Sequence, residues 1–129
     1  MAKIPDSVAS FVSQQLESPV QLELLVLLME SPDRWWDASS VATELRVTKD
    51  AARHALEELA SRNLLAIRLT DDVHYQFQPG DDGLSQLMRA FKDSWRTNPV
   101  AIVQLLTERS HRSIRDFADA FRIRRDDDT

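Results

Sequence analysis

The sequence contains no cysteine and only two glycines, Gly80 and Gly83, in 129 residues. Without cysteine the chain has no disulfide framework, no thiolate metal ligand and no cysteine nucleophile. With so few glycines it has no glycine-rich phosphate loop, and an all-β fold built on tight turns is disfavoured. What remains is a chain of ordinary globular composition, 43% hydrophobic and 29% charged, whose length suits one domain.

Long apolar runs are also missing. The most apolar stretch, residues 20–29, is too short to span a bilayer, and it contains Gln21 and Glu23. The amino-terminal residues lack the apolar segment of a signal peptide. We therefore expect a cytoplasmic protein with no membrane partner.

No residue pattern of catalysis or metal binding is recognisable. His54, His74 and His111 are far apart in the sequence and lack metal-ligand spacing. There is no Gly-x-Ser-x-Gly motif or Ser-His-Asp arrangement, and the paired carboxylates at 57–58 and 71–72 are neighbours on elements that we expect to be exposed. We expect no enzyme, no metal and no cofactor.

Residues 38–63 show the pattern of two helices joined by a short turn. Asp37 can cap a helix over 38–45, and Thr48 can cap a second helix from about Lys49 to Arg62. The second helix should end at Asn63, a residue that tolerates the left-handed conformation. Its apolar face has i, i+3, i+4, i+7 spacing and consists of Ala52, Ala55, Leu56 and Leu59. Such a pair is a helix-turn-helix, whose second helix can enter a DNA major groove.

The next residues predict a β-hairpin. Residues 64–69 and 73–78 alternate in the manner of strands around a turn at Thr70-Asp71-Asp72. We expect the inward side chains to be Leu65, Ile67, Leu69, Val73, Tyr75 and Phe77. Before the first helix of the motif, Trp35 and Trp36 occupy the place of a short additional strand. Because neighbours in a strand face opposite sides, one tryptophan should be in the core and the other partly exposed.

These elements resemble the winged helix-turn-helix regulators of the MarR and PadR kind. The resemblance covers roughly Ser18 to Pro79, and its residues are Leu45, Val47, Thr48, Arg53, Ala55, Leu56, Leu59, Leu64 and Leu65. It implies a mainly α fold with a small β-hairpin, the wing, and a helical carboxyl-terminal extension. Glu57-Glu58 and the acidic wing tip depart from the family pattern. Arg46 also departs from it, because the family usually has glycine at this position of the turn. A left-handed conformation of Arg46 would cost about 1 kcal/mol. The alternative is that Arg46 has an ordinary conformation in a slightly altered turn.

The break at 79–83 suggests two parts. Residues 1–79 would form the winged domain with an amino-terminal helix, and residues 80–129 a helical extension packed on it. The extension has more apolar helix face than one small winged helix needs, so we expect a homodimer. The expected dimer-interface residues are Leu84, Leu87, Met88, Phe91, Trp95, Phe117 and Phe121.

The end of the extension predicts a last helix. Ser113 and Asp116 resemble a capping box, and the apolar face of that helix would consist of Ile114, Phe117, Ala118 and Phe121. Three interpretations remain open: the helix docks on a partner subunit, its arginines reach DNA, or it packs on its own domain.

The resemblance implies a transcription regulator that binds duplex DNA. The expected contacts are Thr48, Lys49, Asp50, Arg53 and His54 on the recognition helix, and Arg68 and His74 on the wing. The charge distribution argues against strong DNA binding by the helix-turn-helix and the wing. Residues 38–78 contain five bases and six acids, whereas residues 84–125 contain nine bases and four acids. Since phosphate neutralisation supplies most non-specific affinity, the alternative is a winged-helix module that binds a protein partner and has little or no affinity for DNA.

Overall fold

The computed structural model describes residues 4–107. Helices dominate, and the expected mainly α fold with one antiparallel hairpin is confirmed. The elements are α1 (Asp6–Gln15), α2 (Pro19–Glu30), α3 (Ala38–Leu45), α4 (Lys49–Ser61), β1 (Leu65–Leu69), β2 (Val73–Phe77) and α5 (Asp82–Thr97), followed by helical residues 99–107.

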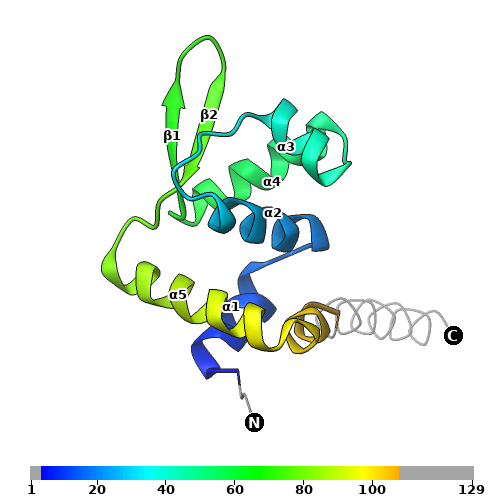
Figure 1. Ribbon diagram of the computed structural model, residues 1–129, viewed down its shortest axis with the longest axis vertical. Coiled ribbons are helices and arrows are strands. Elements are labelled where there is room, and N and C mark those ends of the chain that lie inside the picture. Colours follow the sequence, from blue (N-terminus) through cyan, green and yellow to red (C-terminus); the bar gives the residue numbers. More distant parts are fainter. Residues whose placement is uncertain (1–3, 108–129) are drawn as a thin grey trace, which may run out of the picture.

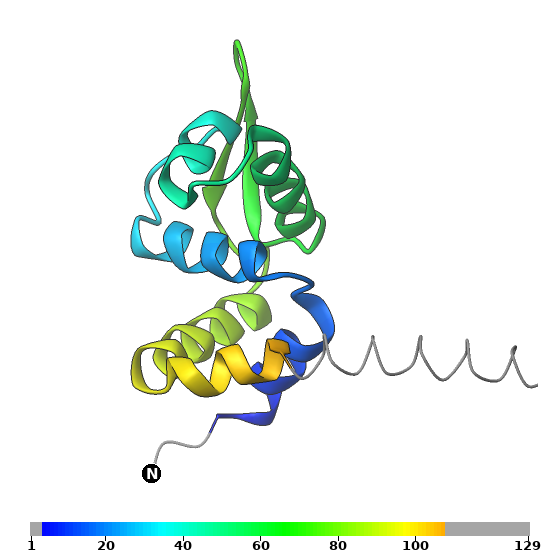
Figure 2. The ribbon, with the colours of Figure 1, turned by 90° about the vertical axis from the view of Figure 1, so that its right-hand side faces the viewer.

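Helix α2 lies at the centre of the molecule. The hairpin, α3 and α4 lie on one side of it, and α1, α5 and residues 99–107 lie on the other (Figures 1 and 2). The sequence grouped α1 with the winged domain, but in space it packs on α5, where the rings of Phe11 and Phe91 meet edge to face at 5.9 Å. One continuous apolar core joins both sides.

The central place of α2 follows from its sequence. Ser18 caps the helix by accepting a hydrogen bond from the Gln21 N–H (3.3 Å), and Pro19 suits the first helical position. The rest is apolar nearly all round, so α2 is stable only where neighbours cover it on several sides; its fully buried residues include Leu24, Leu25 and Leu28. Neither α2 nor any other helix of residues 4–107 has the length and apolar character needed to cross a membrane.

The hairpin has the expected strands and turn but not the expected burial. β1 pairs with β2 from Leu65 opposite Phe77 to Leu69 opposite Val73, and an isolated bridge joins Trp36 to Tyr75 of β2. Leu65 and Tyr75 are buried, but the prediction that Ile67 and Leu69 point into the core was wrong, because these side chains are 55% and 76% exposed.

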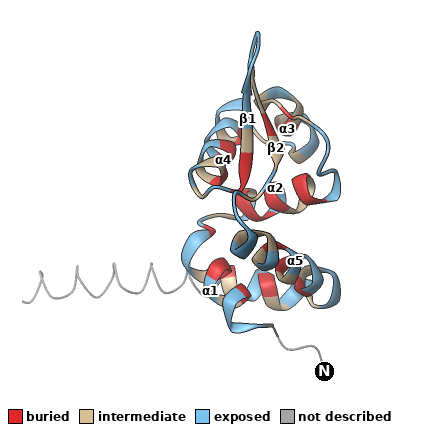
Figure 3. Cartoon of the chain, turned by 90° about the vertical axis from the view of Figure 1, so that its left-hand side faces the viewer, coloured by how far each residue is buried: buried red, intermediate tan, exposed pale blue. Residues whose placement is uncertain are grey.

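Position along the hairpin explains this difference. The alternation does place the apolar side chains on one face, but the outer half of the hairpin extends beyond α3 and α4, so nothing in the described chain covers that half (Figure 3). Trp36 and Trp35 behave as expected, since the first is buried and the second is half-buried.

Candidate nucleic-acid interface

Polar contacts fix the start of α3. The Asp37 carboxylate accepts a hydrogen bond from the Ser40 N–H (2.7 Å), and the Ser40 hydroxyl accepts one from the Asp37 N–H (3.1 Å). The bond from the Ser40 backbone, followed by that from its side chain, lowers the pKa of Asp37. Such a capping box satisfies two N–H groups that the first turn of a helix leaves without partners.

The turn between α3 and α4 requires a left-handed residue. Arg46 has φ 57° and ψ 46°, and the Val47 N–H donates to the Ala42 carbonyl oxygen (3.1 Å). Of the two interpretations of Arg46 left open by the sequence, the left-handed one is therefore correct. Thr48 then caps α4 by accepting a hydrogen bond from the Ala51 N–H (3.1 Å). Three residues are thus enough to reverse the chain between the two helices.

Helix α4 has one buried and one exposed face. The predicted apolar residues Ala52, Ala55, Leu56 and Leu59 are all buried. The opposite face is exposed and consists of Lys49, Asp50, Arg53, His54 and Glu57. Glu58 does not belong to it, because its carboxylate pairs with Arg62 at 3.1 Å. The face therefore holds two permanent positive charges, two negative charges and one histidine.

An ion pair occupies the middle of this face. The Arg53 guanidinium lies 2.7 Å from the Asp50 carboxylate, and both side chains are largely exposed, at 56% and 84%. In water such a pair is weak, and a guanidinium has five N–H donors, so Arg53 keeps donors for another acceptor. Lys49 forms no ion pair with any residue of the described chain. The basic groups of α4 are thus accessible, but Asp50 reduces their attraction for an anion.

The basic residues of the hairpin contact groups close to them. Arg68 lies opposite His74 in the register, and its guanidinium stacks 4.3 Å above the ring of Trp35. The Nδ1 atom of His74 lies 3.2 Å from the Asp72 carbonyl oxygen. A guanidinium on an aromatic face keeps its charge and the donors at its edge, so Arg68 presents them at a fixed place.

Tyr75 is buried, and its backbone pairs with Trp36. Burial raises the pKa of its phenol, and the negative charge of Glu57 adds to that effect while Arg53 opposes it. Sequence reasoning correctly placed Tyr75 in the core, but it did not identify Trp35 as the support of Arg68. The double tryptophan was the only signal for that contact.

Several solved structures share this arrangement of elements. The chain is similar to a possible transcriptional regulator from Methanosarcina mazei, at 16% identity over 80% of this chain and 86% of the other, with a TM-score of 0.50. It is also similar to RV1404 from Mycobacterium tuberculosis, at 17% identity over 88% and 82% with a TM-score of 0.52. No protein-family model and no curated protein sequence matches it.

A third neighbour is the heme sensor protein PefR from Streptococcus agalactiae, solved in complex with heme. It is 15% identical over 89% of this chain and 82% of the other, with a TM-score of 0.51. The chain has the winged helix-turn-helix fold. In the nomenclature of this fold, α4 is the recognition helix and the β1–β2 hairpin is the wing. Identities this low establish the fold alone.

The winged fold brings most of the expected contact residues together. Lys49, Asp50, Arg53 and His54 share the exposed face of the recognition helix. The Thr48 hydroxyl is engaged in capping. Arg68 and His74 lie on the wing face turned away from Tyr75, because their position in the register alternates with that of Tyr75. The two sets of bases therefore lie on different faces of the same half of the molecule.

The residues expected at a dimer interface fall into three groups. Met88 and Phe91 are buried inside the chain, at 1% and 0% exposure, and present no surface to a second copy. Leu84, Leu87 and Trp95 are half-buried. Phe117 and Phe121 lie outside the described residues, as does His111. Among residues 4–107, no three histidine, aspartate or glutamate side chains are grouped so that they could hold a metal ion.

Proposed function

We propose that this chain is a DNA-binding transcription regulator. One observation carries the proposal: a capped three-residue turn holds α4 so that Lys49, Arg53 and His54 face solvent while its other face is buried. A helix presented in this way fits a major groove, where arginine and lysine donate to guanine and histidine can donate to an acceptor. Similarity in fold to a possible transcriptional regulator supports the same role.

The charges set the character of that binding. Asp50 and Glu57 lie beside the bases of α4, and Asp71 and Asp72 form the exposed wing tip. Few phosphates can therefore be neutralised, and non-specific affinity should be low with a shallow dependence on salt. Most of the affinity for a specific site would come from base contacts of α4.

We further propose that the protein binds DNA as a homodimer joined through the helical extension. A two-fold dimer would present two copies of α4 to successive half-sites. Of the residues expected at the interface, Leu84, Leu87 and Trp95 of α5 are half-buried, and a second copy would cover them. Sedimentation of the full chain at high micromolar concentration measures this, and a monomer there contradicts it.

A second function has an observation of its own. Ile67 and Leu69 are exposed on the wing, next to Asp71 and Asp72. An apolar pair beside two carboxylates suits a protein surface better than a phosphate backbone. A winged-helix module that binds a protein partner and has little or no affinity for DNA is therefore the competing proposal.

The test is a DNA titration of Arg53→Ala. A genomic-fragment pull-down with the purified full chain supplies the duplex, and a random duplex is the reference, each at two salt concentrations. Arg53→Ala should weaken specific binding by about 1–3 kcal/mol if the guanidinium makes a bidentate base contact. Arg96→Ala is the matched control, since Arg96 pairs with Asp93 at the same i, i+3 spacing but on α5; it should leave binding unchanged.

Substitutions at the wing tip provide an independent test. Changing Asp71 and Asp72 to asparagine should strengthen binding to both duplexes, because repulsion from phosphate is removed without any gain in readout. If neither the Arg53 nor the wing-tip variants shift the titrations, α4 and the wing do not bind DNA. The interaction-module proposal then replaces the regulator.

A further inference from the structure

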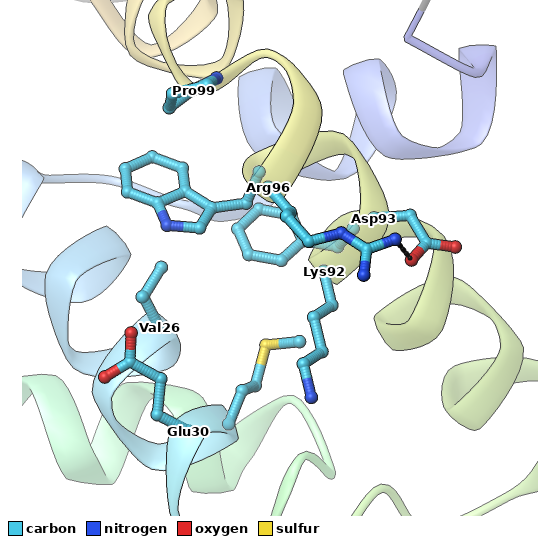
Figure 4. Close-up of a pocket in the computed structure, with 9 residues that line it drawn as sticks. Val26, Glu30, Lys92, Asp93, Arg96 and Pro99 are labelled. Carbon is cyan, nitrogen blue, oxygen red and sulfur yellow. Dashed lines mark hydrogen bonds and ion pairs between the residues drawn. The ribbon is translucent and has the colours of Figure 1, made fainter.

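A groove runs along α2 on the side of the molecule away from the wing. Two cavities form it, of about 480 Å³ and about 200 Å³. Trp95 of α5 lines both cavities, and Figure 4 shows the larger one, which Pro99 also lines. The smaller cavity is lined by Thr107, where the described chain ends.

The floor of the groove is one face of α2. Leu22 lines the smaller cavity, and Val26 and Met29 line the larger one. Their spacing of four and three residues is that of neighbouring turns, so the groove follows the helix axis for about two turns. An apolar groove of this shape fits the apolar face of another helix, whose anchors would recur at i, i+3, i+4 and i+7.

The rims of the groove have opposite charge. Glu23 and Glu30 stand on the α2 rim, seven residues apart, and both are exposed. Neither forms an ion pair with another residue of 4–107. The opposite rim, on α5, has Lys92 and Arg96, of which Arg96 pairs with Asp93 at 3.3 Å.

We propose that residues 113–122 of the same chain fold back and occupy this groove as a helix. Their apolar positions, Ile114, Phe117, Ala118 and Phe121, have the i, i+3, i+4, i+7 spacing that the groove requires. Residues 108–112 can span at most about 20 Å. Because Thr107 lines the smaller cavity, the segment enters the groove at that cavity. The segment then runs parallel to α2, and its Phe121 reaches the larger cavity.

That direction also aligns the charges. Arg115 and Arg122 are seven residues apart, as are Glu23 and Glu30. In the parallel orientation Arg115 lies beside Glu23, and Arg122 lies beside Glu30.

The docked segment would have two consequences. It fills the groove beside Trp95, which is then closed to other ligands. It also neutralises Arg115 and Arg122, so these two bases of the extension do not add to DNA affinity. The inference does not depend on the proposed function, because it involves neither α4 nor the wing.

The experiment uses disulfide cross-linking in the full chain, which has no native cysteine. The aligned variants are Glu23→Cys with Arg115→Cys, and Glu30→Cys with Arg122→Cys. The controls exchange partners: Glu23→Cys with Arg122→Cys, and Glu30→Cys with Arg115→Cys. A disulfide needs Cα atoms about 4.4–6.8 Å apart, and seven residues of helix shift a position by about 10 Å. Under mild oxidation we expect the aligned pairs to close at least about tenfold faster than the exchanged pairs.

Two further measurements make the result decisive. Circular dichroism of the reduced variants should match that of the unsubstituted protein, since positions 23 and 30 are exposed. Adding Phe117→Ser and Phe121→Ser to the Glu30→Cys, Arg122→Cys variant should slow closure at least about tenfold, because the apolar anchors are lost. A monomeric, oxidised band on a non-reducing gel is the expected product. Equal rates for aligned and exchanged pairs overturn the proposal, and a disulfide-linked dimer overturns it by assigning the groove to the segment of a second copy.

Discussion

The base and the tip of the wing have the same alternation of apolar and polar residues but very different surroundings. At the base, Leu65 and Tyr75 are 7% and 6% exposed, against α4 and the core. At the tip, Leu69 has the same orientation and is 76% exposed. The pleat decides which face a side chain occupies, whereas the neighbouring elements decide whether that face is covered. The tip therefore has apolar side chains without the stability that burial provides, which is a feature of surfaces that meet a partner.

The largest expected effect concerns a fully buried side chain. Leu56 of α4 is completely buried, so Leu56→Asp should destabilise the protein by at least about 3 kcal/mol, because it buries an unpaired charge. Chemical denaturation followed by circular dichroism measures the change. Lys49→Ala, on the exposed face of the same helix, is the control and should leave the free energy of unfolding nearly unchanged. Similar losses in both variants would mean that the faces of α4 are misassigned.

The second prediction compares the two ends of β1 directly. Leu65→Ala should cost about 2–3 kcal/mol, because a buried side chain is truncated and leaves a cavity. Leu69→Ala makes the same chemical change at an exposed site and should cost less than about 0.5 kcal/mol. Both are read from urea denaturation midpoints. A cost at Leu69 equal to that at Leu65 would show that some other surface covers the wing tip in solution.

The third prediction turns from burial to polar contacts at the start of α3. Asp37→Ala should cost about 1 kcal/mol through loss of the capping bond from the Ser40 N–H. Because the pKa of Asp37 is lowered in the folded protein, its charge stabilises the fold above the ordinary pKa of an aspartate, and this contribution is lost as the pH falls through the folded pKa.

The pH dependence provides the control for this cap. Asp37→Asn keeps an acceptor oxygen without the charge, so its stability should differ from the unsubstituted protein near neutral pH, and the difference should shrink in acid. Thermal melts across that range measure it. A difference that is constant with pH would contradict a role for the charge.

The smallest expected effect concerns the turn before α4. Arg46 is left-handed, which is unfavourable for a residue with a Cβ. Arg46→Gly should therefore stabilise the fold by roughly 0.5–1 kcal/mol, reduced by the extra freedom of glycine in the unfolded chain. Glu44→Gly, two residues earlier inside α3, should destabilise by a similar amount. Should Arg46→Gly also destabilise, the arginine side chain makes a contribution that outweighs its conformation.

The helix-turn-helix could be predicted from sequence because its signals are local. The caps Asp37 and Thr48 and the stripe from Ala52 to Leu59 depend on residues within a few turns of one another, and the structure confirms them. The mainly α fold and the positions of the two hairpin strands followed from the same kind of pattern.

What could not be predicted depends on contacts between distant residues. The exposure of Ile67 and Leu69 depends on how far the hairpin extends past α3 and α4. The position of α1 on α5 depends on the meeting of Phe11 and Phe91, eighty residues apart in the sequence. The pairing of Arg53 with Asp50 was within reach of the i, i+3 rule, but spacing alone does not say which of several neighbours a guanidinium selects.

The base of the wing is closed by a contact between Asn63, in the turn after α4, and Gly80, two residues before α5. The Gly80 N–H donates to the Asn63 carbonyl oxygen (2.9 Å), and a Cβ at position 80 would collide with the Asn63 side chain. Asn63 is itself left-handed, with φ 64°. The segment between these residues contains the whole hairpin, and the contact between Asn63 and Gly80 fixes its two ends together. An insertion or a fluorescent label at Asp71 would leave the contact between Asn63 and Gly80 intact, so the wing can be lengthened from its tip. Grafting a foreign hairpin, in contrast, requires that the asparagine and the glycine be transferred with it.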